Sequence, residues 1–275
     1  MSRIRVRLLK THGDFRQCER LQQIVWGTLG VSSEVMAVTQ KYGGVVLGAF
    51  VGDRLAGFIY AFLARRRDRL IHWSHMMAVA PEDRDRGLGF RMKLEHRRLA
   101  LALGIKSICW TYDPLQSRNA ALNVSRLGAR VEEYIPDCYG HFPSRIEKGL
   151  ASDRFVVNWR IALPVVGHRL KKGSPAPGSL LLPRVNETRL NAQGLLVNRK
   201  ISWGVHEPRL LVEIPSNTDE IRRRSIALAR RWRTQARQIF ERYFSSGYRV
   251  EDFRSVGQAA ELRCYYILRR DRAKR

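Results

Sequence analysis

The stretch RDRGLGFRMK, residues 84–93, joins two glycines to four cations at the start of a helical pattern. A helix start offers backbone N–H groups without intrahelical partners and the positive end of the helix dipole. Gly87 and Gly89 have no Cβ, so the backbone amides can approach an anion closely. Arg84 and Arg86 add positive charge at the same point. The stretch therefore predicts a cradle for a pyrophosphate.

Two common phosphate-binding motifs are excluded, because neither GxxxxGK[ST] nor GxGxxG occurs here. The alternative is the start of a basic surface helix, which leaves both glycines unexplained. We expect Arg91 and Lys93 on the exposed side of the helix that the cradle opens. Glu82 and Asp83 are expected to balance the charge of the first helical turn.

The elements around the cradle indicate an α+β (α/β) domain. The alternation of apolar residues, the glycine stops and a tight turn at residues 52–54 predict the following elements: a strand at 3–9, a helix ending at Gly27, a hairpin at 45–65, a strand at 71–81, the helix after the cradle, a strand at 106–113, a helix ending at Gly128, and strands at 129–135 and 153–163. We expect this domain to span residues 1–163.

A stretch rich in glycine, proline and basic residues favours a linker over residues 164–180. The remaining residues, 181–275, read as a C-terminal αβ region. It has a strand at 210–215, one long helix at 219–246 and two further strands. This order repeats the strand, helix, glycine, strand, strand order of the first domain's back half. The hypothesis of a duplicated half domain and the alternative, that any αβ unit has this order, both stay open.

The motif V-x-P-x-x-R-x-x-G-x-G, residues 79–89, resembles the acyl-CoA signature of the GNAT superfamily of N-acyltransferases. The segment NAALNVSRLG, residues 119–128, resembles the helix that follows in that family. The later VEIP, WR and GY segments resemble a poorly described subgroup with an extra C-terminal region. The resemblance implies a mixed, mostly antiparallel sheet flanked by helices.

The resemblance also implies an acyl-CoA co-substrate: acetyl-CoA or a small acyl-CoA such as succinyl-CoA. Its pantetheine arm would run along Ala78 and Val79, where the family separates two parallel strands. Asn119 would line the cofactor side of the following helix. The residues expected to hold the pyrophosphate are Arg84, Asp85, Arg86, Gly87, Leu88, Gly89 and Phe90.

Acyl transfer to an amine needs a base for the ammonium and a proton for the departing thiolate. Related enzymes place a His or Glu near the position of His75, and a His with an ordinary pKa suits a base. A hydrogen-bonded structural His is the alternative. Asp113 ends the next strand. It is expected to bind the acceptor ammonium or to orient a base, and the alternative is a cap for the loop after it.

The family's usual acid, a Tyr four residues before the helix-ending glycine, is replaced by Val124. In the proposed half-repeat the same position holds Tyr243, a second source of a phenol. Its alternative role is in the core, because it falls on the apolar stripe of its helix. Tyr139 is a further candidate acid, with a loop anchor as the alternative.

Composition sets the wider expectations. The formal charge is +25, which favours anionic partners. The Arg-rich helix at 222–242 is expected to be a solvated face, with nucleic acid or an anionic surface as the alternative. The four cysteines are far apart, so no metal is expected. No signal peptide or membrane span is expected, and we predict a cytoplasmic protein.

The sequence favours transfer of an acyl group from CoA to the amine of a small molecule or amino acid. The alternative is a catalytically weak GNAT-like module that binds nucleic acid or a protein tail, and a homodimer also stays open. Acceptor choice in the family depends on segments that correspond to 26–42 and 135–153, which show no pattern that identifies a substrate.

Overall fold

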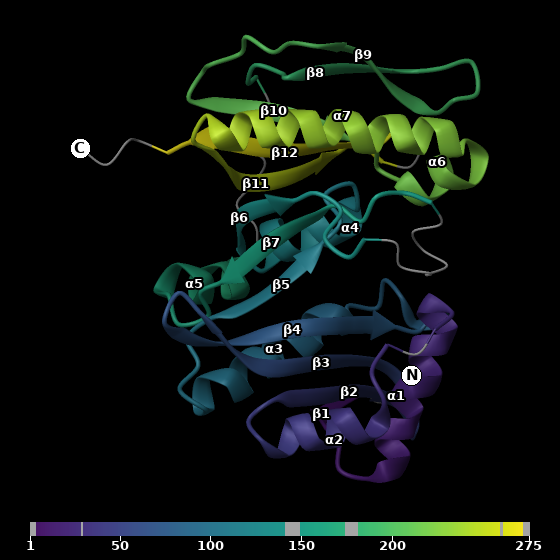
Figure 1. Ribbon diagram of the computed structural model, residues 1–275, viewed down its shortest axis with the longest axis vertical. Coiled ribbons are helices and arrows are strands. Elements are labelled where there is room, and N and C mark those ends of the chain that lie inside the picture. The colour runs from purple at the N-terminus through teal and green to yellow at the C-terminus, as the bar shows by residue number, and fades with distance from the viewer. Residues whose placement is uncertain (1–3, 29, 141–148, 174–180, 259–260, 272–275) are drawn as a thin grey trace. The chain divides into compact units, whose positions relative to one another are not determined.

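The computed structural model describes residues 4–28, 30–140, 149–173, 181–258 and 261–271 (Figure 1). The chain divides into two compact units. Unit 1 is made of the residues up to Trp110 together with Trp159–Leu163, and unit 2 of the other described residues. Strands β5 and β7 therefore have residues in both units. The predicted domain boundaries at residues 163 and 180 do not coincide with this division, and they stay predictions.

Unit 1 contains one sheet with helices on both faces. Its elements are β1 (Ile4–Leu8), α1 (His12–Trp26), α2 (Ser33–Lys41), β2 (Val45–Val51), β3 (Arg54–Arg66), β4 (Arg69–Val79), the short helix η1 (Pro81–Asp83), α3 (Leu88–Ala102) and the start of β5 (Ile108–Tyr112). Strands β1 to β4 pair antiparallel in sequence order, and β5 pairs parallel to β4.

The two faces of this sheet have separate cores. Phe58 and Tyr60 of β3 pack in the cluster that holds side chains of α1 and α2. Ile59 and Ala61, which alternate with them, pack against Leu88 and Met92 of α3. Alternate residues of a strand point to opposite faces, so α3 covers the face opposite to α1 and α2.

Unit 2 contains the end of β5 and the rest of the chain. Its elements are α4 (Ser117–Ala120), the π-helix η2 (Ala121–Arg126), β6 (Arg130–Ile135), β7 (Arg154–Trp159), α5 (Pro164–Lys172), β8 (Asn186–Leu190), β9 (Leu196–Ile201), β10 (Arg209–Ile214), α6 (Thr218–Arg224), α7 (Ile226–Ser245), β11 (Tyr248–Val256) and β12 (Arg263–Arg270). Strands β8 and β9 form a hairpin, and β10, β12 and β11 form an antiparallel sheet in that order.

Several differences from the predicted elements have local causes. The predicted helix 219–246 is two helices, because Ser225 has extended backbone angles and accepts a hydrogen bond from Leu228 N as the cap of α7. The predicted linker begins with helix α5 (Pro164–Lys172), and residues 174–180 lie outside the described residues. Helix α2 and the β8–β9 hairpin were not predicted.

The order of strands supports the half-repeat. In the hydrogen-bonded order, β7 lies between β5 and β6 just as β12 lies between β10 and β11. Each outer pair also carries one irregularity of register, between Val131 and Glu133 in β6 and between Val250 and Asp252 in β11. In each half, the irregularity lies at the same number of residues after the glycine that ends the preceding helix. The fold-class prediction, including a C-terminal region built like the back half, agrees with this topology.

The two halves also exchange matching hydrogen bonds within unit 2. The Ser117 hydroxyl donates to Ser216 O at 2.6 Å, and the Thr218 hydroxyl donates to Leu115 O at 2.6 Å. Each hydroxyl lies at the first residue of its helix and each carbonyl lies in the loop before the other helix. The contact is thus reciprocal, as in a two-fold interface between two copies of one unit.

Candidate functional site

The loop before α3 is fixed by a buried carboxylate. Asp83 is almost fully buried and accepts from Arg54 at 2.7 Å and from Arg86 at 2.5 Å. Asp83 was expected to face the first turn of α3, but it anchors the loop instead. Arg86 therefore meets Asp83 on one side while its side chain stays 39% exposed. Arg84 is exposed.

Helix α3 begins without a side-chain cap. Gly87 occupies the cap position with φ of 75°, and the first turn contains no acidic residue. A Cβ built on Gly87 would meet nothing within 4 Å, so the space in front of the helix is open. Asp85 also has a positive φ of 61°, which turns the loop toward the helix start. An open, uncapped helix start is suited to an anion.

Strand β4 leads into this loop and separates from β5. Only two residue pairs join the strands, His72 with Ile108 and Trp73 with Cys109. On its other side β4 stays paired with β3 as far as Val79 with Gly57. Within the described residues, the edge of β4 that holds Ala78 and Val79 is thus free of pairing with β5. The expected separation of two parallel strands is present.

A β-bulge in β4 contains His75. Tyr60 faces Met76 and Ala61 faces Ser74, so His75 is the extra residue between them. Its ring lies against Tyr60 and Phe62, with centroids 6.2 and 5.9 Å away, and the residue as a whole is exposed. Partial burial of the ring lowers the pKa of His75 below its ordinary value. A neutral imidazole on an exposed residue can accept a proton, and bulges often re-aim a side chain at a functional site.

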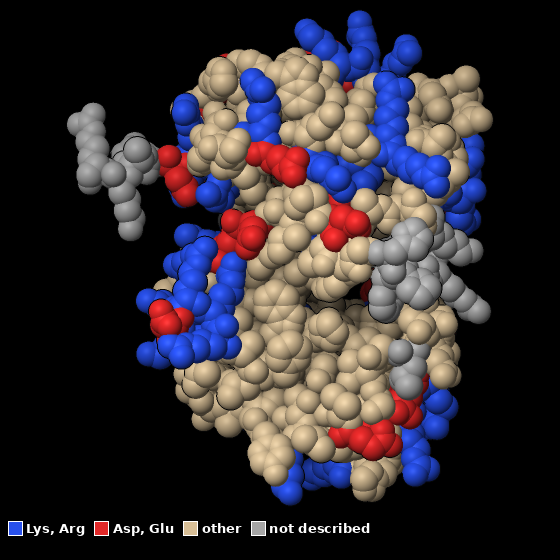
Figure 2. All heavy atoms as spheres, viewed as in Figure 1, with Lys and Arg blue, Asp and Glu red and all other residues tan. Residues whose placement is uncertain are grey.

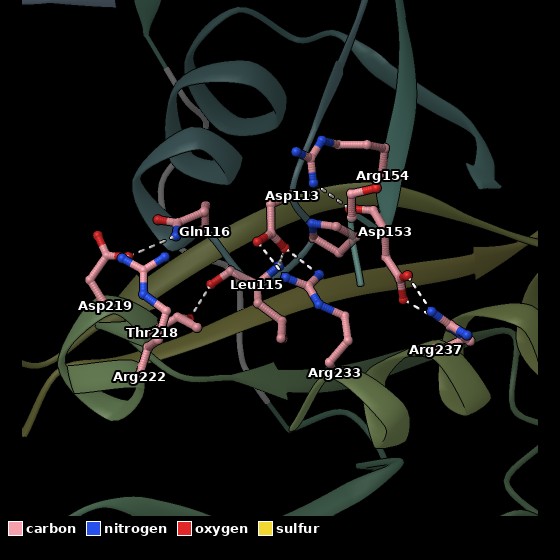
Figure 3. Close-up of polar contacts among 12 residues, drawn as sticks. Asp113, Leu115, Gln116, Asp153, Arg154, Thr218, Asp219, Arg222, Arg233 and Arg237 are labelled. Atoms are coloured by element: carbon pink, nitrogen blue, oxygen red, sulfur yellow. Dashed lines mark hydrogen bonds and ion pairs between the residues drawn. The ribbon is translucent and has the colours of Figure 1, made fainter. Parts of the chain in front are cut away.

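Asp113, in unit 2, is already paired. Its two oxygens accept from Arg233 of α7 at 2.7 and 2.6 Å, and one also accepts from Leu115 N at 2.9 Å (Figure 3). Burial raises the pKa of Asp113, but the charge and hydrogen bonds of Arg233 outweigh this effect, so that the pKa lies below its ordinary value. The expected loop cap is observed, and both carboxylate oxygens of Asp113 already accept hydrogen bonds from Arg233.

A second arginine of α7 makes a similar contact. Arg237 donates to both oxygens of the fully buried Asp153, at 2.5 and 3.0 Å (Figure 3). Asp153 also accepts from Tyr134. Part of the Arg-rich helix therefore faces the interior of unit 2, contrary to the expectation of a solvated face. No local sequence pattern predicts these two pairs, because the partners are 120 and 84 residues apart.

The two candidate phenols differ in exposure. Tyr243 is 2% exposed and its hydroxyl donates to Ser202 O, so it lies in the core, the alternative that its apolar stripe indicated. Tyr139 is 43% exposed and its hydroxyl bonds the Thr111 hydroxyl of β5 at 2.8 Å. Val124 is buried, and Asn119 is exposed in the first turns of α4. Tyr139 is thus the accessible phenol of the two.

Lys93 of α3 is a further residue that lies elsewhere than predicted. It was expected on the exposed side of the helix, yet it is 1% exposed. Its ammonium nitrogen lies 3.1 Å from Ser74 Oγ and 3.7 Å from the centre of the Trp110 ring. Arg91, expected on the same side, is exposed. The residue before Lys93 in the sequence, Met92, is also buried, and a lysine is ordinarily assigned to the surface.

Other findings concern metals and membranes. Among the described residues, no group of three or more His, Cys, Asp or Glu side chains is arranged to hold a metal ion. A search of the helices in the described ranges found none with the length and apolar character to cross a membrane.

Comparison with solved structures returns GNAT N-acetyltransferases. The chain is similar to the ribosomal-protein-S18-alanine N-acetyltransferase from Escherichia coli, with 16% identity over 58% of this chain and 96% of that one and a TM-score of 0.46. It is also similar to an acetyltransferase of the GNAT family from Streptococcus pneumoniae (18% identity, 57% and 98% covered, TM-score 0.44). A third is Arabidopsis thaliana Naa50 in complex with a bisubstrate analogue (12% identity, 56% and 97% covered, TM-score 0.46).

No protein-family model and no curated protein sequence matches the chain. The mostly antiparallel sheet and the separated parallel pair β4–β5 are the features that the sequence resemblance implied. The chain has a mixed, mostly antiparallel sheet flanked by helices, with an added C-terminal αβ region.

Proposed function

We propose that this protein transfers an acyl group, acetyl or a small acyl such as succinyl, from acyl-CoA to the amine of a small molecule or amino acid. The observation that supports this most strongly is the uncapped start of α3 at Gly87, directly after a strand whose edge is unpaired. The amides of residues 84–90 would hold the pyrophosphate. The backbone of Ala78 and Val79 would pair with the pantetheine arm.

The bulge in β4 supports the acyl-transfer step. A bulged residue is left out of the ladder, so the His75 backbone N–H would serve a carbonyl oxygen that gains negative charge. The His75 ring would take the proton that the acceptor ammonium loses. The neutral amine then attacks the thioester carbon, the new C–N bond forms, and the C–S bond breaks to release the CoA thiolate. That thiolate must gain one proton, and Tyr139 stays a candidate donor.

The test is a thermal shift with acetyl-CoA, succinyl-CoA and free CoA. Binding to the folded state raises the melting temperature by mass action. Gly87→Val should abolish the rise, because a branched side chain would fill the space in front of the helix start. Gly104→Val is a matched control, since Gly104 follows the other end of α3 with the same φ of 75° and the same open surroundings.

Both variants should lose a similar amount of stability, about 1 to 3 kcal/mol for a strained positive φ. The Gly104 variant should keep the response to acyl-CoA. If the wild-type protein shows no response to any acyl-CoA, the proposed function is wrong. If both variants respond alike, the cradle at Gly87 is wrong.

The second candidate function is a basic module that binds nucleic acid. Exposed cations of unit 2 favour it, and Figure 2 shows many Lys and Arg side chains on the surface. The exposed cations of the β8–β9 hairpin are Arg189, Arg199 and Lys200. Binding of this kind would weaken steeply with salt. Tight, salt-sensitive binding of RNA or DNA together with no response to acyl-CoA would favour this candidate over the enzyme.

A further inference from the structure

Lys93 lies where β4 and β5 separate. The last residue pair between these parallel strands is Trp73 with Cys109. The next residue on each strand is Ser74 and Trp110. These two residues are the ones that Lys93 contacts, with Ser74 Oγ at 3.1 Å and the Trp110 ring centre at 3.7 Å. The Lys93 ammonium therefore lies on the α3 face of the sheet, beside the point where the two strands separate, inside unit 1.

The surroundings of Lys93 do not neutralise a charge. In the part of the chain that the structure describes, no carboxylate pairs with it. Its ammonium contacts the Ser74 hydroxyl and the face of the Trp110 indole ring. Burial lowers the pKa of Lys93 from 10.5 to about 7. An amine in this setting exists in both charged and neutral forms near neutral pH, which is the requirement for a group that gives or takes a proton.

The other titratable groups near Lys93 are two buried histidines. His72 Nε2 donates to Gly43 O at 3.0 Å, because a carbonyl only accepts. His72 Nδ1 then accepts from His96 Nε2 at 3.1 Å, which leaves His96 Nδ1 as an acceptor without a partner. Burial lowers the pKa of both rings, so they are neutral at pH 7. Within this cluster, Lys93 is thus the group that holds a transferable proton.

We propose that Lys93 is the catalytic acid that protonates the departing CoA thiolate. The inference rests on the proposed function, because it requires the thioester to lie in the opening between β4 and β5. When the C–S bond breaks, the sulfur keeps the electron pair and takes one proton from the Lys93 ammonium. Lys93 becomes a neutral amine, and water returns the proton after the thiol leaves. Lys93 would thus donate the proton that the family's usual tyrosine donates, because this chain has Val124 at the position of that tyrosine.

The first test compares Lys93→Met with Lys106→Met in thiol release from acetyl-CoA, with a panel of primary amines as acceptors. Methionine keeps the length and apolar stem of the lysine, so the fold should persist. We expect kcat to fall about 100-fold, in the range for loss of an acid–base group, with KM for acetyl-CoA nearly unchanged. Lys106 is exposed after α3, and its variant should match the wild-type protein.

The pH profile separates a catalytic role from a structural one. The wild-type kcat should decline above about pH 7, where Lys93 loses its proton, and the Lys93→Met variant should lack this decline. A Lys93→Met variant that keeps the wild-type kcat and the alkaline decline would overturn the proposal. So would a Tyr139→Phe variant that abolishes the decline while Lys93→Met leaves it in place.

A binding test needs neither an acceptor nor a variant. The wild-type protein should bind CoA about tenfold more tightly than desulfo-CoA, which lacks the thiol, as expected for a hydrogen bond between the sulfur and a charged group. Equal affinities would overturn the assignment of Lys93 while leaving the proposed function intact. If CoA and acetyl-CoA both fail to bind, the proposed function itself fails, and the inference falls with it.

Discussion

Two buried cations in different regions of the molecule have opposite surroundings. Arg233 of α7 is 6% exposed and forms a bidentate ion pair with Asp113. Lys93 of α3 is 1% exposed and meets a hydroxyl and an aromatic ring. Nearby carboxylates raise the pKa of Arg233 despite its burial, whereas burial alone lowers the pKa of Lys93 to about 7.

The difference separates a structural charge from a reactive one. A buried charge with a hydrogen-bonded partner keeps its charge at all ordinary pH values, so it can hold two segments together. A buried amine without such a partner changes its charge near neutral pH. Perturbed groups of the second kind are concentrated at functional sites. The contrast predicts that the arginine acts on stability and the lysine on chemistry.

The largest expected effect is on the arginine. Arg233→Met should lower the free energy of unfolding by about 3 to 5 kcal/mol, because it leaves the Asp113 carboxylate buried without its partner. Chemical denaturation followed by circular dichroism measures this change. Arg242→Met on the same helix is the control, and it should stay within about 0.5 kcal/mol because Arg242 is exposed. Equal effects of the two variants would show that the ion pair between Arg233 and Asp113 does not stabilise the fold.

The second prediction concerns Lys93 and pH. Between about pH 7 and the ordinary Lys value of 10.5, the unfolded chain binds more protons at this position than the folded protein. The unfolding free energy of the wild-type protein should therefore rise with pH there, by up to about 1.4 kcal/mol per pH unit from this group. Lys93→Met should lack this contribution. Its stability relative to wild type should be greatest at pH 7 and decrease toward pH 10.

Denaturation curves of wild type, Lys93→Met and Lys106→Met at pH 7, 8.5 and 10 test this expectation. The exposed Lys106 should give a curve that runs parallel to the wild-type curve. A constant difference between wild type and Lys93→Met over the whole range would mean that Lys93 keeps its charge when buried. The contrast with Arg233 would then be lost.

The third prediction concerns Asp113 in acid. Its pKa is lowered in the folded protein, so the stabilisation from its charge is present above its ordinary value of 3.8 and is lost as the pH falls through the folded value. The stability difference between wild type and Asp113→Asn should be constant from pH 7 to about pH 4 and should shrink below that. Acid titrations followed by fluorescence check this, and parallel curves down to pH 2 would contradict it.

Local signals in the sequence were enough for much of unit 1. The turn at Gly52, the helix stop at Gly27 and the uncapped start at Gly87 depend on the backbone freedom of single residues. The strand before the cradle was visible from its apolar run. The fold class and the place of the uncapped helix start could therefore be predicted from the sequence.

The groups around the chemistry could not be predicted in the same way. Asp113 and Arg233 are 120 residues apart, and no local pattern joins them. Lys93 follows the buried Met92, and a lysine is ordinarily assigned to the surface. The break at Ser225 looks from the sequence like an ordinary position within a long amphipathic helix. Each of these features depends on packing between segments rather than on local propensity.

The smallest expected effect is that of Ser74→Ala, which tests whether Lys93 depends on its one hydroxyl neighbour. Loss of a buried hydrogen bond should lower the unfolding free energy by about 1 kcal/mol at pH 7. The same change should move the alkaline decline of kcat to lower pH, because the ammonium loses its acceptor while the neutral amine loses less. Ser107→Ala, at a partly buried serine of the same unit, is the control and should leave the pH profile in place. An unchanged decline in the Ser74 variant would mean that the Trp110 ring alone sets the proton affinity of Lys93, and that the two buried cations differ only in their distance from a carboxylate.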